Sequence, residues 1–446
     1  MASRIIPGMI LVALLQLLPA LAASAYEVTA PGRVVAFGDV HGAYEDWVTL
    51  LQEVGVINAD LDWAGGNTYL VSLGDLIDRG PGSRSVVALM MKLDAQAEAA
   101  GGAVHMVLGN HEVLVMTGDL RYVSDEEYAD FAALESQGER EAAFAAWRLS
   151  NPDGDDQAAR QAFDADYPPG YFALRRTYAG DGEFGRWLRQ QPFVIKVNDK
   201  IYMHGGIAYD LIGESLDEIN ERMGGELQAY LDNQTTLRTA GALPWYADYD
   251  DQLGLLNVAA EQFVAANPDV RAEWFDAMIG LFDAQQASLF SPNAPNWYRG
   301  SAYCHPYAES FNTESFLKRA GASQLVIGHT PSRGQVINRM EGQVIRLDTG
   351  MLKSVYGGRA AALVSGDGND YVHYLASDEK AQPVVEGRSL AMGSAGMSDA
   401  ELEDFMRSAQ VVVDDAPDNS AATAIRVQQN LGQTSNAAVF MTKDDA

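Results

Sequence analysis

Short apolar runs alternate with polar turns and amphipathic segments near the start of the chain. Residues 33–37 predict a buried strand, and a Gly-Asp turn joins it to a helix with apolar side chains on one face (Trp47, Leu50, Leu51 and Val54). The same plan recurs at residues 68–73, which lead to a helix from about Ser83, and at residues 103–108. Alternating strands and helices predict an α/β fold, in which ligands gather beyond the carboxyl ends of the strands. All three polar turns lie at that predicted edge.

Two long segments interrupt this pattern and predict helical insertions. Residues 124–189 are helical and rich in turn-forming residues, and residues 215–289 carry more amphipathic helix. Strand signals return at residues 193–197, 201–203, 324–327, 344–347, 360–364 and 371–375. We therefore expect one domain over residues 26–376, with the two insertions as caps. Residues 377–446 are polar and predict a linker and a small appendage of unknown role, with a hairpin near residues 425–441.

Composition narrows the range of partners. With 446 residues and 47% hydrophobic content, the chain can bury a substantial core. The 61 acidic against 31 basic side chains give a net charge of -30, which repels a nucleic acid backbone and argues against nucleic acid as a partner. Bound cations and a few arginines can still reverse the field inside a small site, so a phosphorylated substrate is not excluded. Cys304 is the only cysteine, which rules out an intrachain disulfide.

The first 25 residues have the pattern of a secretory signal peptide. Arg4 gives a positive start, residues 9–18 are mostly apolar, and Ala-Ser-Ala at residues 23–25 offers a cleavage site, so that the mature chain would begin near Tyr26. A retained membrane anchor is the alternative, but the run is shorter than the ~20 apolar residues of a spanning helix. It is also interrupted by Pro7, Gly8, Gln16 and Pro19. We therefore favour a periplasmic or secreted protein without a stable membrane span; an uncleaved segment would tether it to the membrane.

Polar strings follow the predicted strands. Any one of them has a structural explanation, such as an Asp that caps a helix or a His that packs at a strand end. Taken together, four of the seven histidines, two Asp and one Asn come directly after apolar strands: Asp39, His41, Asp75, Asn110, His111, His204 and His329. Carboxylates, imidazoles and an amide oxygen suit Mn, Fe or Zn. The number of ligands fits two ions that share one bridging carboxylate.

The ordered strings resemble those of a known family. GDVHG (38–42), GDLIDRG (74–80), GNHE (109–112), HGG (204–206) and GHT (328–330) look like the motifs of the phosphoprotein phosphatase family within the calcineurin-like metallophosphoesterases. The signal peptide and the string WYRG at residues 297–300 are most similar to its bacterial Shewanella-like phosphatase branch. The resemblance covers residues 33–375. It implies a two-sheet metallophosphatase sandwich flanked by helices, with inserted helical caps.

The resemblance also implies roles for individual residues. It implies two metal ions, the first held by Asp39, His41 and Asp75, and the second held by Asp75 as a bridge with Asn110, His204 and His329.

The remaining motif residues would act on the substrate. Arg79 and Arg299 would grip phosphate oxygens, since a guanidinium matches phosphate geometry. His111, oriented by Asp78, would protonate the leaving oxygen. Many related diesterases carry GHxH, whose final His completes the first metal site. Pro331 stands at that position and favours the phosphoprotein phosphatase subset. The SAPNYC string of eukaryotic members is missing, so a preference for Ser/Thr does not transfer.

We therefore expect an exported metal-dependent phosphatase that hydrolyses phosphate monoesters by in-line attack of a hydroxide bridging the two metals. A phosphoprotein or a small phosphomonoester would be the substrate. One alternative is a phosphodiesterase or nucleotide pyrophosphohydrolase that uses the same site. Another is a non-catalytic binding protein of the cell envelope, although such proteins usually lack a metal ligand and none is missing here.

Overall fold

A computed structural model of the chain describes residues 24–267, 269–366 and 369–376, together with four short strands farther along the chain. It divides into one unit that ends at Gly387 and a second from Arg388 to Ala446, and each is described by itself. The predicted signal peptide, apart from Ser24 and Ala25, lies outside the described residues, as does most of the predicted linker and appendage. No helix in the described part of the chain is long and apolar enough to cross a membrane.

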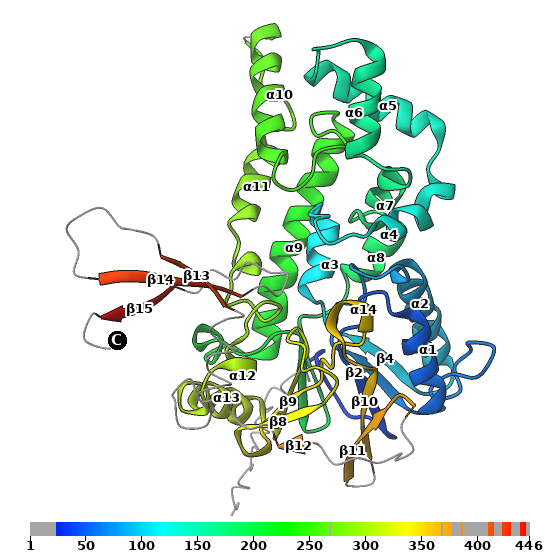
Figure 1. The fold of residues 1–446 in the computed structure, drawn as a ribbon, viewed down its shortest axis with the longest axis vertical. Coiled ribbons are helices and arrows are strands. Elements are labelled where there is room, and N and C mark those ends of the chain that lie inside the picture. Colours follow the sequence, from blue (N-terminus) through cyan, green and yellow to red (C-terminus); the bar gives the residue numbers. More distant parts are fainter. Residues whose placement is uncertain are drawn as a thin grey trace, which may run out of the picture. The chain divides into compact units, whose positions relative to one another are not determined.

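Two mixed sheets form the centre of the first unit (Figure 1). The five-stranded sheet has the order β11 (Asn369–Tyr374), β10 (Ala361–Gly366), β2 (Val34–Phe37), β3 (Tyr69–Ser72) and β4 (Ala103–Met106). The seven-stranded sheet has the order β1 (Glu27–Val28), β5 (Val194–Val197), β6 (Lys200–Met203), β7 (Gln324–Ile327), β9 (Val344–Arg346), β8 (Ile337–Arg339) and β12 (Val385–Glu386). Strands β2, β3 and β4 are parallel, and so are β6, β7 and β9. The predicted two-sheet α/β fold is confirmed.

The central strands β2, β3 and β7 are buried on both faces over nearly their whole length, which explains why their sequences are largely apolar runs. In β2, Val34 and Ala36 belong to an apolar cluster that joins the two sheets and includes Val326 of β7. The alternate residues Val35 and Phe37 belong to the cluster formed with the helices. Helices therefore cover the outer faces of the sandwich, while its interior is closed by side chains of both sheets.

Helices of the core connect the strands. α1 (Tyr44–Glu53) and α2 (Ser83–Ala99) follow β2 and β3, and Trp47 of α1 packs against Phe37 with the two rings tilted by 56° and their centroids 5.7 Å apart. The other helices near the strand ends are α3 (Asn110–Thr117), α12 (Gly300–Tyr303), α13 (Pro306–Ala320) and α14 (Lys353–Tyr356). Short 3-10 helices occur at η1 (Ala132–Leu134), η2 (Tyr209–Leu211), η3 (Ser288–Phe290) and η4 (Met340–Gly342).

The segments predicted as insertions are helical and gather on one side of the two sheets in Figure 1. The first contains α4 (Asp125–Phe131), α5 (Gln137–Ser150), α6 (Asp156–Asp166), α7 (Tyr171–Tyr178) and α8 (Glu183–Leu188). The second contains α9 (Leu216–Thr239), α10 (Gln252–Ala266) and α11 (Phe275–Gln285). We call these two groups of helices the caps.

The second unit contains an antiparallel sheet of three strands, β13 (Ala409–Val413), β14 (Ala422–Gln429) and β15 (Ala438–Thr442). In it Ile425 pairs with Val439, so a hairpin lies where the sequence predicts one. The boundary predicted at residue 377 and the role of this unit stay predictions.

Candidate metal centre and active site

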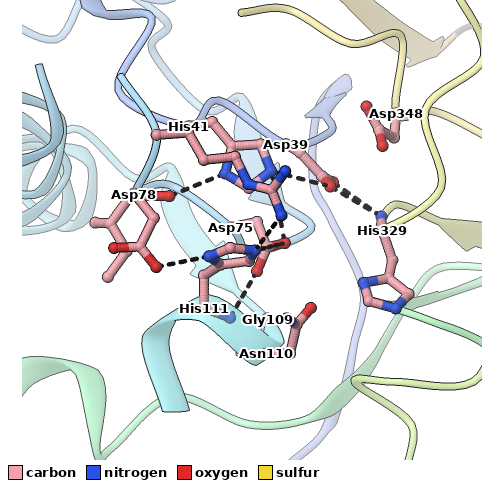
Figure 2. A network of polar contacts seen from close by, with 12 residues as sticks. Asp39, His41, Asp75, Asp78, Gly109, Asn110, His111, His329 and Asp348 are labelled. Carbon is pink, nitrogen blue, oxygen red and sulfur yellow. Dashed lines mark hydrogen bonds and ion pairs between the residues drawn. The ribbon is translucent and has the colours of Figure 1, made fainter. Parts of the chain in front are cut away.

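The six predicted metal ligands come together at the carboxyl ends of parallel strands from both sheets. Asp39, Asp75 and Asn110 follow β2, β3 and β4 in the five-stranded sheet, whereas His204 and His329 follow β6 and β7 in the seven-stranded sheet. His41 lies two residues beyond Asp39. All six side chains are buried, with exposed fractions of at most 4%. Figure 2 shows Asp39, His41, Asp75, Asn110 and His329 around one small volume.

One group of ligand atoms is centred on His204. Its Nε2 lies 3.2 Å from Asp75 Oδ2, 3.2 Å from Asn110 Oδ1 and 3.1 Å from His329 Nδ1. The opposite ring nitrogen, Nδ1, lies 2.6 Å from the carbonyl oxygen of Leu73, which places a proton on Nδ1. A proton on Nε2 can reach only one of the three facing atoms, whereas a cation can contact them all. The arrangement of donor atoms therefore fits a metal ion.

A second group of side chains approaches the same oxygen, Asp75 Oδ2. His41 Nε2 is 3.8 Å from Asp75 Oδ2 and 3.9 Å from Asp39 Oδ2, and its Nδ1 is fixed by the carbonyl oxygen of Ile77 at 2.9 Å. His111 Nε2 also lies 3.9 Å from Asp75 Oδ2. Ligand atoms of Asp75 thus take part in two clusters, one with His41 and His111 and one with His204 and His329. This is the arrangement that two ions sharing one carboxylate require.

The charge balance of this volume also favours cations. Burial opposes ionisation of Asp75, but the imidazoles of His204 and His111 outweigh it and hold the pKa of Asp75 well below its usual range. Burial, together with the nearby Asp348 and Asp75 carboxylates, raises the pKa of Asp39 well above its usual range. Bound cations would relieve this repulsion between buried carboxylates.

Asp348 is a buried acid of the site that sequence analysis missed. It is 2% exposed, hydrogen-bonds the Asp39 carboxyl group, and accepts a hydrogen bond from Gly350 N at 2.8 Å. In turn, both oxygens of Asp39 accept from His329 N, at 3.0 and 3.1 Å (Figure 2). The signal was present, since Asp348 directly follows the strand predicted at residues 344–347, as Asp39 and Asp75 follow theirs.

Glu112 supports the metal ligands through the backbone. Its carboxylate accepts from Asp75 N at 2.9 Å, Leu76 N at 2.7 Å and Gly109 N at 3.0 Å. Burial and the Asp75 carboxylate raise the pKa of Glu112 to about 7. Glu112 therefore ties the turn after β3 to the start of α3, a role that the sequence left unassigned.

Several site residues adopt a left-handed backbone. Of the eleven non-glycine residues with positive φ in the described chain, five are predicted site residues: His41, Asp75, Asp78, Arg79 and His329. This conformation is disfavoured for residues with a Cβ atom and persists where surrounding structure enforces it, often at functional sites. The turns after β2, β3 and β7 are therefore shaped to direct side chains inward rather than to minimise backbone strain.

The predicted proton donor forms a buried pair. His111 Nδ1 lies 2.6 Å from Asp78 Oδ2 (Figure 2), and both side chains are 1% exposed. Burial lowers the pKa of His111 to about 4 and raises the pKa of Asp78 well above its usual range. Both shifts favour a neutral pair that shares a proton. On the other side of the ring, His111 Nε2 lies 3.2 Å from Arg79 Nη2.

The two predicted phosphate-binding arginines contact different residues of the site, Arg79 next to His111 and Arg299 next to His329. The Arg79 guanidinium stacks on the rings of Tyr122 and Tyr356, with its Cζ 4.8 and 5.5 Å from the centroids. Arg299 donates from Nη1 to the His329 carbonyl oxygen at 2.7 Å and to Thr330 Oγ1 at 3.1 Å. Neither tyrosine carried a sequence signal, because both lie in loops or short helices away from the motifs. The roles of the ten predicted site residues stay predictions.

Comparison with known proteins agrees with this geometry. A family model described as calcineurin-like phosphoesterase matches residues 32–333. The chain is 31% identical over 207 residues to Shewanella-like protein phosphatase 2 of Arabidopsis thaliana. The matched stretch covers 45% of this chain and 53% of the Arabidopsis protein. The match thus spans about half the length of the Arabidopsis protein.

Solved structures are also similar. A structure of a cold-active protein tyrosine phosphatase superimposes with a TM-score of 0.51 at 25% identity over 79% of each chain, and another structure under that name comes from a psychrophilic Shewanella species. A shorter stretch of 76 residues is 41% identical to the symmetrical bis(5'-nucleosyl)-tetraphosphatase of Cronobacter sakazakii, covering 17% of this chain and 22% of that protein.

Because the family model matches more than half of its residues, the protein belongs to the calcineurin-like phosphoesterase family, a family of metallophosphoesterases. Its similarity to Shewanella-like phosphatases confirms the resemblance inferred from the motifs.

Proposed function

We propose that this protein is a metal-dependent phosphatase that hydrolyses phosphate monoesters, with a phosphoprotein or a small phosphomonoester as substrate. The observation that carries the proposal is that Asp75 belongs to two clusters of potential metal ligands. The similarity to a protein tyrosine phosphatase and to a Shewanella-like protein phosphatase supports a phosphoprotein among the candidate substrates.

Two divalent or trivalent ions, Mn, Fe or Zn, fit the ligand atoms. The first would be held by Asp39, His41 and Asp75, and the second by Asp75, Asn110, His204 and His329. When bound, such ions polarise the phosphoryl group and make hydroxide available at neutral pH for in-line attack on phosphorus.

Other residues of the chain would bind the phosphate and move a proton. The guanidinium of Arg79 lies near two tyrosine rings and next to His111, and it can pair with phosphate oxygens. Arg299 would pair with them from the side of His329. His111 would donate a proton from Nε2 to the leaving oxygen while Asp78 holds Nδ1, which fixes the orientation of the ring.

We further propose that the chain acts outside the cytoplasm, in the periplasm or as a secreted protein. The pattern of the first 25 residues supports this location, and retention of that segment would tether the protein to a membrane.

The second candidate is a phosphodiesterase or nucleotide pyrophosphohydrolase on the same site. The short stretch that is 41% identical to a bis(5'-nucleosyl)-tetraphosphatase favours it. Rates on bis-aryl and mono-aryl phosphates separate the two candidates, because a monoesterase cleaves the mono-aryl compound and leaves the bis-aryl compound intact.

The central experiment uses the protein beginning at Tyr26, stripped of metal and assayed with an aryl phosphate as Mn²⁺, Zn²⁺ or Mg²⁺ is restored. We expect no turnover without metal and recovery with at least one ion. An unchanged rate in the stripped protein, or no rate with any ion, aryl phosphate or phosphopeptide, would overturn the proposal.

A further inference from the structure

Helix α3 carries three site residues at its first turn and is buried along its whole length. Asn110, His111 and Glu112 begin the helix, and all eight of its residues are buried. It ends at Thr117, and the next residue, Gly118, has a left-handed φ of 103°. A helix of eight residues is about 12 Å long, so its two ends lie in different surroundings. Its amino end is in the metal centre, and its carboxyl end is among the cap helices.

The caps hold the carboxyl end of α3 with three buried side chains. The carbonyl oxygen of Thr117 accepts from Gln234 Nε2 of α9 at 2.9 Å and from Gln252 Nε2 of α10 at 2.8 Å. The carbonyl oxygen of Gly118 accepts from Arg175 Nη1 of α7 at 2.9 Å. Gln234, Gln252 and Arg175 are at most 2% exposed. We call Gln234, Gln252 and Arg175 the α3 clamp.

The clamp is itself held in place. Tyr230 Oη donates to Gln252 Oε1 at 2.8 Å, which orients the amide so that its nitrogen faces α3. Arg175 Nη2 donates to the Ala247 carbonyl oxygen at 2.8 Å, which ties the loop before α10 to the same point. A Cβ atom on Gly118 would meet Arg175 Nη1 at 2.6 Å, so a larger residue there would displace the guanidinium from the Gly118 carbonyl oxygen. A positive charge at the carboxyl end of a helix is also favourable to the helix dipole.

We propose that the caps position the active site through this clamp. In this arrangement α3 is a rigid connection, and the clamp sets the position of Asn110 and His111 relative to Asp75, which hydrogen-bonds His111 N at 3.0 Å. Gln234, Gln252 and Arg175 are positioning residues, since none of them touches the metal ligands. The inference rests on the proposed function, because the groups being positioned are the proposed metal ligand and proton donor. It gives both caps a role in positioning the active site.

The test replaces the amides by a side chain of similar length without a donor. In Gln234→Met and Gln252→Met, Thr117 retains one of its two donors, so each single variant keeps the fold; the double variant removes both. We expect amide hydrogen exchange at residues 110–117 of the metal-free protein to rise in the double variant. With metal restored, kcat on an aryl phosphate should fall about 10- to 100-fold, because small displacements at a reacting centre are costly. KM should stay within about twofold, since substrate-binding groups are unchanged.

The matched control is Gln262→Met, which changes an exposed glutamine of the same helix α10. It should leave both exchange and kcat at the wild-type level. The clamp is refuted if the double variant shows a lower melting temperature but keeps wild-type kcat well below that temperature, or if exchange in α3 is unchanged. Hydrogen exchange is measured without metal or substrate, so a failure of the proposed phosphatase activity would not be mistaken for a failure of the clamp.

Discussion

The two ends of helix α3 differ in how completely their polar groups are paired. At the carboxyl end, the carbonyl oxygens of Thr117 and Gly118 each accept from at least one buried side chain. At the amino end, Asn110 Nδ2 has no hydrogen-bond partner although it is buried, and Asn110 Oδ1 faces His204 Nε2. Buried polar atoms without partners are uncommon in folded proteins, and beside a cluster of potential metal ligands a bound ion or water would explain this one.

The two ends of this short helix therefore serve different purposes: the carboxyl end stabilises the fold, and the amino end belongs to the proposed active site. The carboxyl end contributes to stability, because the buried carbonyl oxygens of Thr117 and Gly118 accept hydrogen bonds from within the protein. The amino end is unfavourable on its own, because buried carboxylates and imidazoles gather there and the amide nitrogen of Asn110 has no partner. Proteins tolerate such groups where a ligand completes them. The predictions below change one end or its surroundings at a time, in order of decreasing expected effect.

The largest effect is expected for Asp75→Asn. Asp75 is the only residue that belongs to both ligand clusters in the described chain, so the variant should lose metal affinity in both. We expect turnover to fall to background, with less than one tightly bound metal per chain by elemental analysis. Asp60→Asn, at an exposed position in a loop, serves as the matched control. Retention of both ions at wild-type affinity would contradict the bridging role.

A smaller effect is expected for His111→Asn. The variant should keep its metal ions and lower kcat by about 10²- to 10³-fold, because it removes only the proton donor. The deficit should shrink for aryl phosphates with very acidic leaving groups, which leave without protonation. The measurement is a plot of log kcat against leaving-group pKa for both proteins. Equal slopes would show that His111 does not protonate the leaving oxygen; loss of metal would show that it is a ligand, as its distance of 3.9 Å to Asp75 allows.

Arg79→Lys should have a moderate effect. A lysine keeps the charge but loses the planar fork and the guanidinium contacts with the rings of Tyr122 and Tyr356. We expect kcat/KM to fall about tenfold, with inhibition by inorganic phosphate weakened to a similar extent. The matched control is Arg84→Lys, whose side chain is at the start of α2 over the ring of Phe131. An unchanged inhibition constant for phosphate would place Arg79 outside the substrate site.

Many of the strands could be predicted because the apolar runs in the sequence are the segments that the fold buries. The strand predicted at residues 324–327 is β7 without change, and the motif residues follow strands as expected. By contrast, the short strand β8 was missed, because three residues of mixed burial carry no period. Sequence spacing brings Asp39 and Asp75 to one sheet edge, but it does not reveal that His329 N donates to Asp39, since 290 positions separate them.

The α3 clamp was out of reach of sequence analysis for the same reason. Gln234 and Gln252 read as ordinary polar positions on amphipathic helices, and their contact with Thr117 spans 117 and 135 positions. Side chains that hold a backbone carbonyl leave no motif, whereas metal ligands do, because ligand chemistry restricts the residue type. The metal ligands could therefore be predicted from residue types, whereas the residues that position them could be found only from the fold.

The smallest effect on the site is expected for Glu127→Gln, a change in the first turn of α4 that acts on stability. Glu127 is 3% exposed and its pKa is raised to about 8, first by burial and then by the Asp78 carboxylate. It accepts hydrogen bonds from Ser124 N at 3.1 Å and from Ser83. Its carboxyl group is therefore protonated in the folded protein at pH values where the unfolded chain has released the proton.

The sign of the pH dependence follows from this shift. A raised pKa means that the folded state binds the proton more tightly, so Glu127 contributes stability that is fully present below pH 4.5 and is lost as the pH rises through about 8. Glutamine does not titrate, so the stability of the variant relative to wild type should increase between pH 5 and pH 8, by at most about 1.4 kcal/mol per pH unit. Melting temperatures of both metal-free proteins across this range provide the measurement, and exposed Glu126→Gln is the control on the same turn. Parallel curves for Glu127→Gln and wild type would mean that water or a cation reaches the carboxylate, and that the cap is more open beside Asp78 than its burial indicates.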